Sequence, residues 1–133
     1  MSTPPRRISR ALRLAVYEKY GGRCAYCGTR LRFDPKEHHQ RGAKFEVDHL
    51  VPKAKGGTND PENLMPSCHQ CNWWKSDRSI EDYRRLIVFR RDGVPFFSKP
   101  QRAWLARHVL DMDEFETGLA PHVFHFEREE TPA

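Results

Sequence analysis

The sequence predicts an α+β fold, in which a strand, a glycine-rich loop, a short return strand and a helix follow one another over residues 44–75. Three observations support this prediction. Residues 44–51 alternate between apolar and polar side chains, as a half-buried strand does. A basic, glycine-rich loop follows at residues 53–59. Two Cys-x-x-Cys pairs stand on either side of this strand and loop, at Cys24/Cys27 and Cys68/Cys71.

The region before the first cysteine pair predicts an amphipathic helix. It starts near Ser9 and stops at Gly21-Gly22, and its apolar residues recur at helical spacing, at Leu12, Ala15 and Val16. Residues 1–7 contain two prolines followed by two arginines and are expected to form a loose basic arm.

The four cysteines predict a zinc site. Each Cys-x-x-Cys turn points two thiolates at one centre, so two such pairs suit a single tetrahedral Zn²⁺. Two disulfides or a redox-active pair are the alternatives. Because no signal-like or membrane-spanning apolar run is present, we expect a cytoplasmic protein without a membrane partner, and a reducing compartment favours metal over disulfide.

The central strand is expected to direct Phe45 and Val47 to one face and Glu46 and Asp48 to the other, and to end at Pro52. Residues 60–63 indicate one short helical turn with proline at its first position. A brief return strand at Leu64 and Met65 follows. Cys68 then opens a helix that carries Cys71, Asn72 and Lys75 on successive turns.

The remainder, residues 79–133, is expected to be a helical C-terminal extension with an acidic tail. One helix starts near Ser79, with Ile80, Tyr83, Leu86 and Ile87 buried, and a second starts at Ser98, with Trp104, Leu105 and His108 inward. Residues 123–126 alternate and could form an edge strand. With no internal repeat, the whole chain of 133 residues is interpreted as a single domain.

The charge distribution is asymmetric. Residues 1–57 hold 13 Lys and Arg against 5 Asp and Glu, whereas residues 111–133 hold 1 against 7. A basic front suggests a polyanionic partner, and a solvated charged surface is the alternative. The neighbouring His38 and His39 are interpreted as loop residues exposed to solvent rather than as metal ligands.

The ordered series of motifs resembles the HNH, or ββα-metal (His-Me finger), nuclease family in its zinc-stapled form. The series comprises Cys-x-x-Cys, Asp-His, Gly-Gly, Asn-Leu and Cys-x-x-Cys-Asn-x-x-Lys, and it covers residues 24–75. The resemblance implies a ββα-metal core with a four-cysteine zinc site, flanked by an N-terminal helix and C-terminal helices. It also implies that the chain is a single HNH nuclease domain.

The same resemblance implies roles for four residues. His49 would be the general base that takes a proton from the attacking water, a task for which imidazole is suited at neutral pH. Asp48 would hold the catalytic divalent ion together with Asn72, and Asn63 would tie the ends of the loop. Asn72 departs from the usual histidine, as in HNN variants, and an amide oxygen favours Mg²⁺ or Mn²⁺ over softer metals.

These roles predict a metal-dependent DNA endonuclease that hydrolyses phosphodiester bonds. Backbone affinity would come from basic residues around the motif, chiefly Arg23, Lys53, Lys55 and Lys75. We expect at least one of Trp73 and Trp74 in the core. The alternatives are a zinc-stapled DNA-binding module that has lost cleavage and a nuclease that acts mainly on RNA. No residue pattern specifies an oligomeric state.

Overall fold

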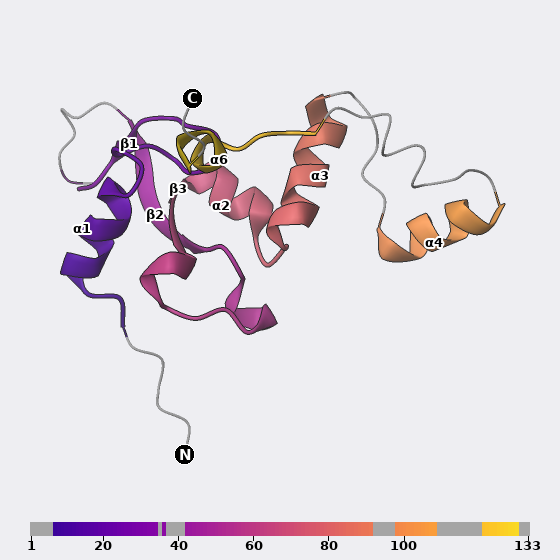
Figure 1. The fold of residues 1–133 in the computed structure, drawn as a ribbon, viewed down its shortest axis with the longest axis horizontal. Coiled ribbons are helices and arrows are strands. Elements are labelled where there is room, and N and C mark those ends of the chain that lie inside the picture. The colour runs from indigo at the N-terminus through magenta and orange to yellow at the C-terminus, as the bar shows by residue number, and fades with distance from the viewer. Residues whose placement is uncertain (1–6, 35, 37–41, 92–97, 109–120, 131–133) are drawn as a thin grey trace, which may run out of the picture. The chain divides into compact units, whose positions relative to one another are not determined.

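The structure is a computed structural model that describes residues 7–34, 36, 42–91, 98–108 and 121–130 (Figure 1). The chain divides into two compact units. Met1–Ile80 and Val123–Ala133 make the first, and Glu81–His122 make the second. The predicted C-terminal extension is therefore split, because its last part belongs to the first unit. His38 and His39 lie outside the described residues, and the single domain over residues 1–133 stays a prediction.

Helix α1 (Arg10–Glu18) follows the predicted pattern. Ser9 caps it, because its Oγ accepts a hydrogen bond from the backbone N–H of Leu12 at 3.1 Å. Its buried face carries Val16, and the ring of Tyr17 packs edge-on against Phe45 at 5.5 Å between centroids. The helix is thus held against the central strand.

A three-stranded sheet forms the centre of the first unit, in the order β1 (Leu31–Arg32), β2 (Ala43–His49) and β3 (Leu64–Cys68). Strands β1 and β2 are parallel, and β2 and β3 are antiparallel, with His49 opposite Leu64 and Phe45 opposite Cys68. Strand β3 is longer than the predicted Leu64–Met65 and includes Pro66. An edge strand tolerates this proline, since one side of it needs no ladder donor.

Helix α2 (His69–Lys75) leaves directly from the end of β3. Cys68 is its N-cap residue, and its sulfur accepts a hydrogen bond from the backbone N–H of Cys71 at 3.4 Å. The order β2, β3, α2 is the predicted strand, strand and helix. The fold is therefore α+β, with a cysteine cluster where the zinc-bearing ββα core was predicted.

The C-terminal segment closes the first unit over the first cysteine pair. The backbone N–H of Phe126 donates to the carbonyl of Ala25 at 2.7 Å, and Ala25 in turn donates to the carbonyl of Pro66 at 2.8 Å. The rings of Phe124 and Phe126 pack edge-on against Tyr26 at 5.6 and 6.2 Å between centroids. The loop of Cys24–Cys27 is thereby fixed between β3 and the C-terminal segment.

The edge strand expected at residues 123–126 is wrong, because this segment starts helix α6 (His125–Glu130). Glu127 accounts for the difference. Its Oε1 accepts a hydrogen bond from the backbone N–H of Phe124 at 2.9 Å, which satisfies a donor at the start of the helix. Local capping therefore decides the conformation over the alternating apolar pattern.

The second unit contains most of helix α3 (Ile80–Arg91) and helix α4 (Lys99–His108). In α3, Tyr83 and Leu86 are buried as predicted, and Val88 and Phe89 are buried in addition. Helix α4 starts after Ser98 as predicted, with a capping box in which Ser98 and Gln101 each donate a backbone N–H to the other's side chain.

The inward face predicted for α4 is wrong. Trp104 is 57% exposed and packs against the ring of His108 one turn further on, with 4.9 Å between ring centroids. Helical spacing shows which side chains share a face, but whether that face is covered depends on other parts of the chain. In the described part of the chain, no helix is long and apolar enough to cross a membrane.

Candidate metal centre and active site

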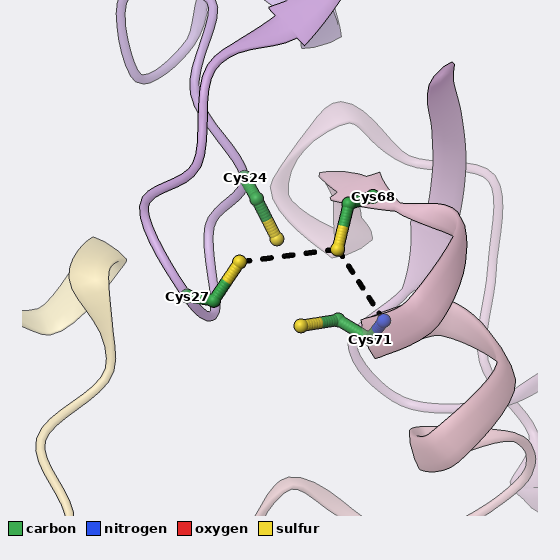
Figure 2. Close-up of side chains that lie close together, drawn as sticks. All are labelled: Cys24, Cys27, Cys68 and Cys71. Carbon is green, nitrogen blue, oxygen red and sulfur yellow. Dashed lines mark hydrogen bonds between the residues drawn. The ribbon is translucent and has the colours of Figure 1, made fainter. Parts of the chain in front are cut away.

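The four cysteines meet in one cluster. Their sulfur atoms all lie within 4.8 Å of one another, and the Cys27 and Cys68 sulfurs are 3.8 Å apart. Figure 2 shows two sulfurs from the loop of Cys24–Cys27 facing two from the start of α2. A tetrahedral Zn²⁺ with bonds of about 2.3 Å to sulfur requires sulfur separations of about 3.8 Å. The cluster can therefore hold a metal ion of this kind.

The disulfide alternative does not fit this arrangement. All four cysteines are free, and 3.8 Å between the Cys27 and Cys68 sulfurs far exceeds a disulfide bond of about 2.05 Å.

Gly28 ends the first cysteine turn with φ +78°, and the ring of His125 lies 3.2 Å from where a Cβ at this glycine would be. The positive φ thus favours glycine at this position, and a Cβ here would also press against the His125 ring.

The electrostatics of the cluster favour a bound cation. Hydrogen bonds from Cys27, Cys68 and Cys71 hold the pKa of the Cys24 thiol well below its ordinary value. Hydrogen bonding to Cys24 in turn raises the pKa of Cys27 and of Cys71. The cysteines thus compete for ionisation. A divalent ion would remove this competition, because it binds all four sulfurs as thiolates.

A buried charged network links this cluster to the end of β2. Asp48 is 6% exposed and Lys75 is fully buried, and Lys75 Nζ lies 3.1 Å from Asp48 Oδ2. The hydroxyl of Tyr26, which stands between Cys24 and Cys27, donates to the same carboxylate oxygen. Lys75 Nζ also donates to the main-chain carbonyl of His49 at 2.8 Å.

The phosphate contact predicted for Lys75 does not fit this position. Its ammonium is fully buried and is held by Asp48 and by the carbonyl of His49. A buried carboxylate needs a compensating charge, and Lys75 provides it. Sequence reasoning missed this role, since a lysine one turn beyond a helical motif residue is usually exposed.

Lys75→Met is expected to reduce the free energy of unfolding by about 3–5 kcal/mol, because it leaves the Asp48 carboxylate buried without a partner. The double variant Lys75→Met with Asp48→Asn should recover part of this loss. Urea unfolding of the zinc-loaded protein measures both values. Lys44→Met, which replaces an exposed lysine of β2, is the control and should stay within about 0.5 kcal/mol of the native protein. Equal stability of Lys75→Met and this control would contradict the buried pair.

His49 ends strand β2 and is partly buried. Its Nε2 is 2.7 Å from the side-chain oxygen of Asn59. The side chains of Asp48 and His49 thus contact different partners, as expected for adjacent strand residues that face opposite sides. Asn59 was not singled out from the sequence, although it directly follows the Gly-Gly-Thr segment.

Asn63 ties together the 51–63 loop, which joins β2 to β3. Its Oδ1 accepts from the backbone N–H of Val51 at 2.8 Å, and its Nδ2 donates to the carbonyls of Thr58 at 2.8 Å and Val51 at 3.1 Å. These bonds join the two sides of the loop, which is the tie that the resemblance implies for this asparagine. An amide can do this because it both donates and accepts.

Asn72 lies on α2 next to Cys71 and is partly buried. Among the residues that the structure describes, its side-chain amide has no hydrogen-bond partner.

The neighbouring Trp73 is 71% exposed and Trp74 is only partly buried, so neither is the core residue that was expected.

The remaining basic residues predicted to contact nucleic acid are exposed. Arg23 donates one guanidinium N–H to the carbonyl of Gly28 at 3.0 Å, and Lys55 donates to the carbonyl of Asp77 at 2.6 Å. Lys53 lines a groove of about 780 Å³ that also includes Arg7 and Asn59. Asn59, which contacts His49 at the end of β2, is therefore one of the residues that line this groove.

Comparison with known proteins agrees with these features. Residues 24–78 match the HNH endonuclease family. The chain is also 41% identical over 106 residues to a CRISPR-associated endonuclease Cas9 of Corynebacterium diphtheriae. It is 29% identical over 94 residues to a CRISPR-associated endonuclease Cas9 of Actinomyces naeslundii. These regions cover 79% and 70% of this chain.

The chain spans less than a tenth of the length of both relatives, at 9% and 8%. The HNH match contains the cysteine cluster, strands β2 and β3 and helix α2. The comparisons therefore support the HNH family and a nuclease function for the segment that carries the site.

Proposed function

We propose that this chain is a metal-dependent DNA endonuclease that hydrolyses phosphodiester bonds, with His49 as the general base. The observation that carries the proposal is the end of β2. There His49 is partly exposed, its Nε2 is held by Asn59, and the buried carboxylate of Asp48 is its direct neighbour. The HNH match over residues 24–78 supports the same assignment.

We propose that Asp48 and Asn72 hold the catalytic ion, and their chemistry fits Mg²⁺ or Mn²⁺. Tyr26 and Lys75 occupy one oxygen of Asp48, while the second has no partner among the described residues. Asn72 adds an amide oxygen. Magnesium sites often have only one or two protein oxygens and complete their shell with water and substrate phosphate. Such an ion would stabilise the negative charge that develops on the phosphate and on the leaving oxygen.

The chain's own residues then divide the work. His49 takes the proton of the attacking water through the ring nitrogen that Asn59 does not bind. Lys75 and Tyr26 balance the buried charge of Asp48 and fix the direction of its carboxylate. Asn63 holds the loop that carries Asn59. For the cysteine cluster we propose a structural Zn²⁺, because four thiolates leave no position open for substrate.

Cleavage of supercoiled plasmid tests this function. The zinc-loaded protein is expected to produce nicked plasmid with Mg²⁺ or Mn²⁺ and none without a divalent ion. A parallel reaction with RNA distinguishes the substrates, since cleavage of RNA alone would contradict a DNA endonuclease. DNA binding without cleavage under every ion would contradict the enzyme and indicate the zinc-stapled binding module instead.

Lys53→Ala is expected to weaken binding to duplex DNA and to reduce the slope of log affinity against log salt by about 1. The reason is the exposed position of Lys53 in the groove that reaches Asn59. Fluorescence anisotropy without added Mg²⁺ or Mn²⁺ measures both effects. Lys99→Ala, which replaces an exposed lysine of α4, serves as the control, and an identical salt slope for the two variants would exclude the groove as the backbone contact.

A further inference from the structure

We infer that Asn59 is the positioning residue for His49: it holds the imidazole in the tautomer with hydrogen on Nε2 and leaves Nδ1 as the basic nitrogen. The contact that carries this is the 2.7 Å distance between His49 Nε2 and Asn59 Oδ1. An amide oxygen can only accept a hydrogen bond, so the ring nitrogen facing it must donate. In a neutral imidazole the other nitrogen then carries the lone pair.

Nδ1 is available to act as a base. It forms no hydrogen bond with any residue that the structure describes. A catalytic base is effective when a third group fixes its tautomer and orientation, while its basic nitrogen faces the reacting proton. The inference rests on the proposed function, and it names which nitrogen of His49 takes the proton.

The 51–63 loop is built to keep Asn59 in place. A Cβ at Gly57 would lie 1.7 Å from the carbonyl oxygen of Val51, so only glycine allows the loop to pass this close to the end of β2. Asn63 then binds the carbonyl of Thr58, the residue next to Asn59. The Thr58 hydroxyl donates to the carboxylate of Asp60 at 2.8 Å on the other side. Asn59 thus stands between two anchored residues.

Lys75 restrains the main chain at His49. Its ammonium binds the main-chain carbonyl of His49 and so holds the backbone from which the imidazole extends. Backbone and ring are therefore restrained by separate partners. Among the residues that the structure describes, the ring of His49 forms one side-chain hydrogen bond, the contact with Asn59.

Two measurements on the zinc-loaded protein test the inference. The first is the ring ¹⁵N spectrum at about pH 9, where imidazole is neutral, with His49 identified as the signal among the seven histidines that His49→Ala lacks. The native protein is expected to show hydrogen on Nε2. Asn59→Ala should show a mixture of tautomers, and Asn59→Asp, which keeps an acceptor oxygen, should restore the native signal.

The second measurement is plasmid cleavage under single-turnover conditions. Asn59→Ala is expected to lower the maximal rate by about 10–100-fold, by analogy with the loss caused when a group that orients a metal-binding histidine is removed. Asn59→Asp should recover most of the maximal rate but require more DNA, because its charge repels phosphate. Gln70→Ala, which removes an exposed amide of α2, is the control and should match the native rate.

The outcomes separate the two proposals. Hydrogen on Nδ1 in the native protein, or an unchanged tautomer and rate in Asn59→Ala, would overturn the role of Asn59 while the nuclease assignment stands. Full cleavage by His49→Ala would overturn the general base instead. The ¹⁵N spectrum does not depend on cleavage. It therefore shows which nitrogen of His49 binds Asn59 even if the protein does not cleave DNA.

Discussion

His49→Ala is expected to lower the rate of DNA cleavage by about 10²–10⁴-fold, the usual contribution of a general base. Alanine removes the imidazole and its contact with Asn59, but it leaves the main-chain carbonyl that Lys75 binds. The pairing of His49 with Leu64 in the sheet also remains. The variant should therefore fold and bind DNA. Nicking of supercoiled plasmid with Mg²⁺ and with Mn²⁺ measures the rate.

The control for this variant is His69→Ala. His69 lies at the start of α2, its side chain is 70% exposed, and its Nδ1 is 2.9 Å from the carboxylate of Glu46. Loss of a surface pair of this kind changes stability by about 1 kcal/mol or less and should not alter cleavage. A folded His49→Ala protein with native activity would contradict the assignment. Equal losses in both variants would point to a general effect of altered folding.

Cys71→Ser is expected to release zinc and to cause the largest loss of stability of any variant considered. Structural zinc contributes on the order of 10–16 kcal/mol in small zinc-dependent peptides, and a serine hydroxyl is a poor replacement for a thiolate. Cys71 also lies in the first turn of the helix that carries Lys75. We expect a lower melting temperature and less bound zinc, measured by calorimetry and by metal analysis of the purified protein.

Chelation of zinc from the native protein provides the matched comparison, and it should reproduce the melting temperature of Cys71→Ser. Cleavage should fall only to the extent that the protein unfolds. The reason is that the cysteine cluster is linked to the end of β2 through the contact of Tyr26 with Asp48, and we do not expect it to touch substrate. Abolished cleavage with unchanged zinc content and melting temperature would contradict the separation of a structural metal from a catalytic one.

Local pattern was sufficient for several features. Ser9 and the glycines at 21–22 predicted the limits of α1, and the Cys-x-x-Cys spacing predicted the cluster that the structure contains. The alternation before His49 predicted β2. These predictions succeed because capping, strand alternation and two-residue ligand spacing depend on neighbours along the chain.

Other features depended on particular polar contacts, one between segments distant in sequence and one within the C-terminal segment. The pattern predicted a phosphate contact for Lys75, but β2 lies beside α2 and brings Asp48 and the carbonyl of His49 to its ammonium. The apolar alternation at residues 123–126 predicted a strand, whereas Glu127 caps a helix there. The periodicity of apolar residues predicts neither the burial of Lys75 nor the start of α6. Each depends on which polar group forms a hydrogen bond or ion pair there.

The sequence by itself determined the order of chemical groups, namely four sulfurs in two pairs, an Asp-His dipeptide and two motif asparagines, and the strands and helix that carry them. Only the tertiary structure decided how they are supported. In the folded chain, Lys75 is buried against Asp48, and Tyr26 of the cysteine loop donates to the same carboxylate. Asn59 contacts His49. The physical reason is that a buried charge and an oriented imidazole each need a partner in space, and chain packing alone determines which residue fills that place.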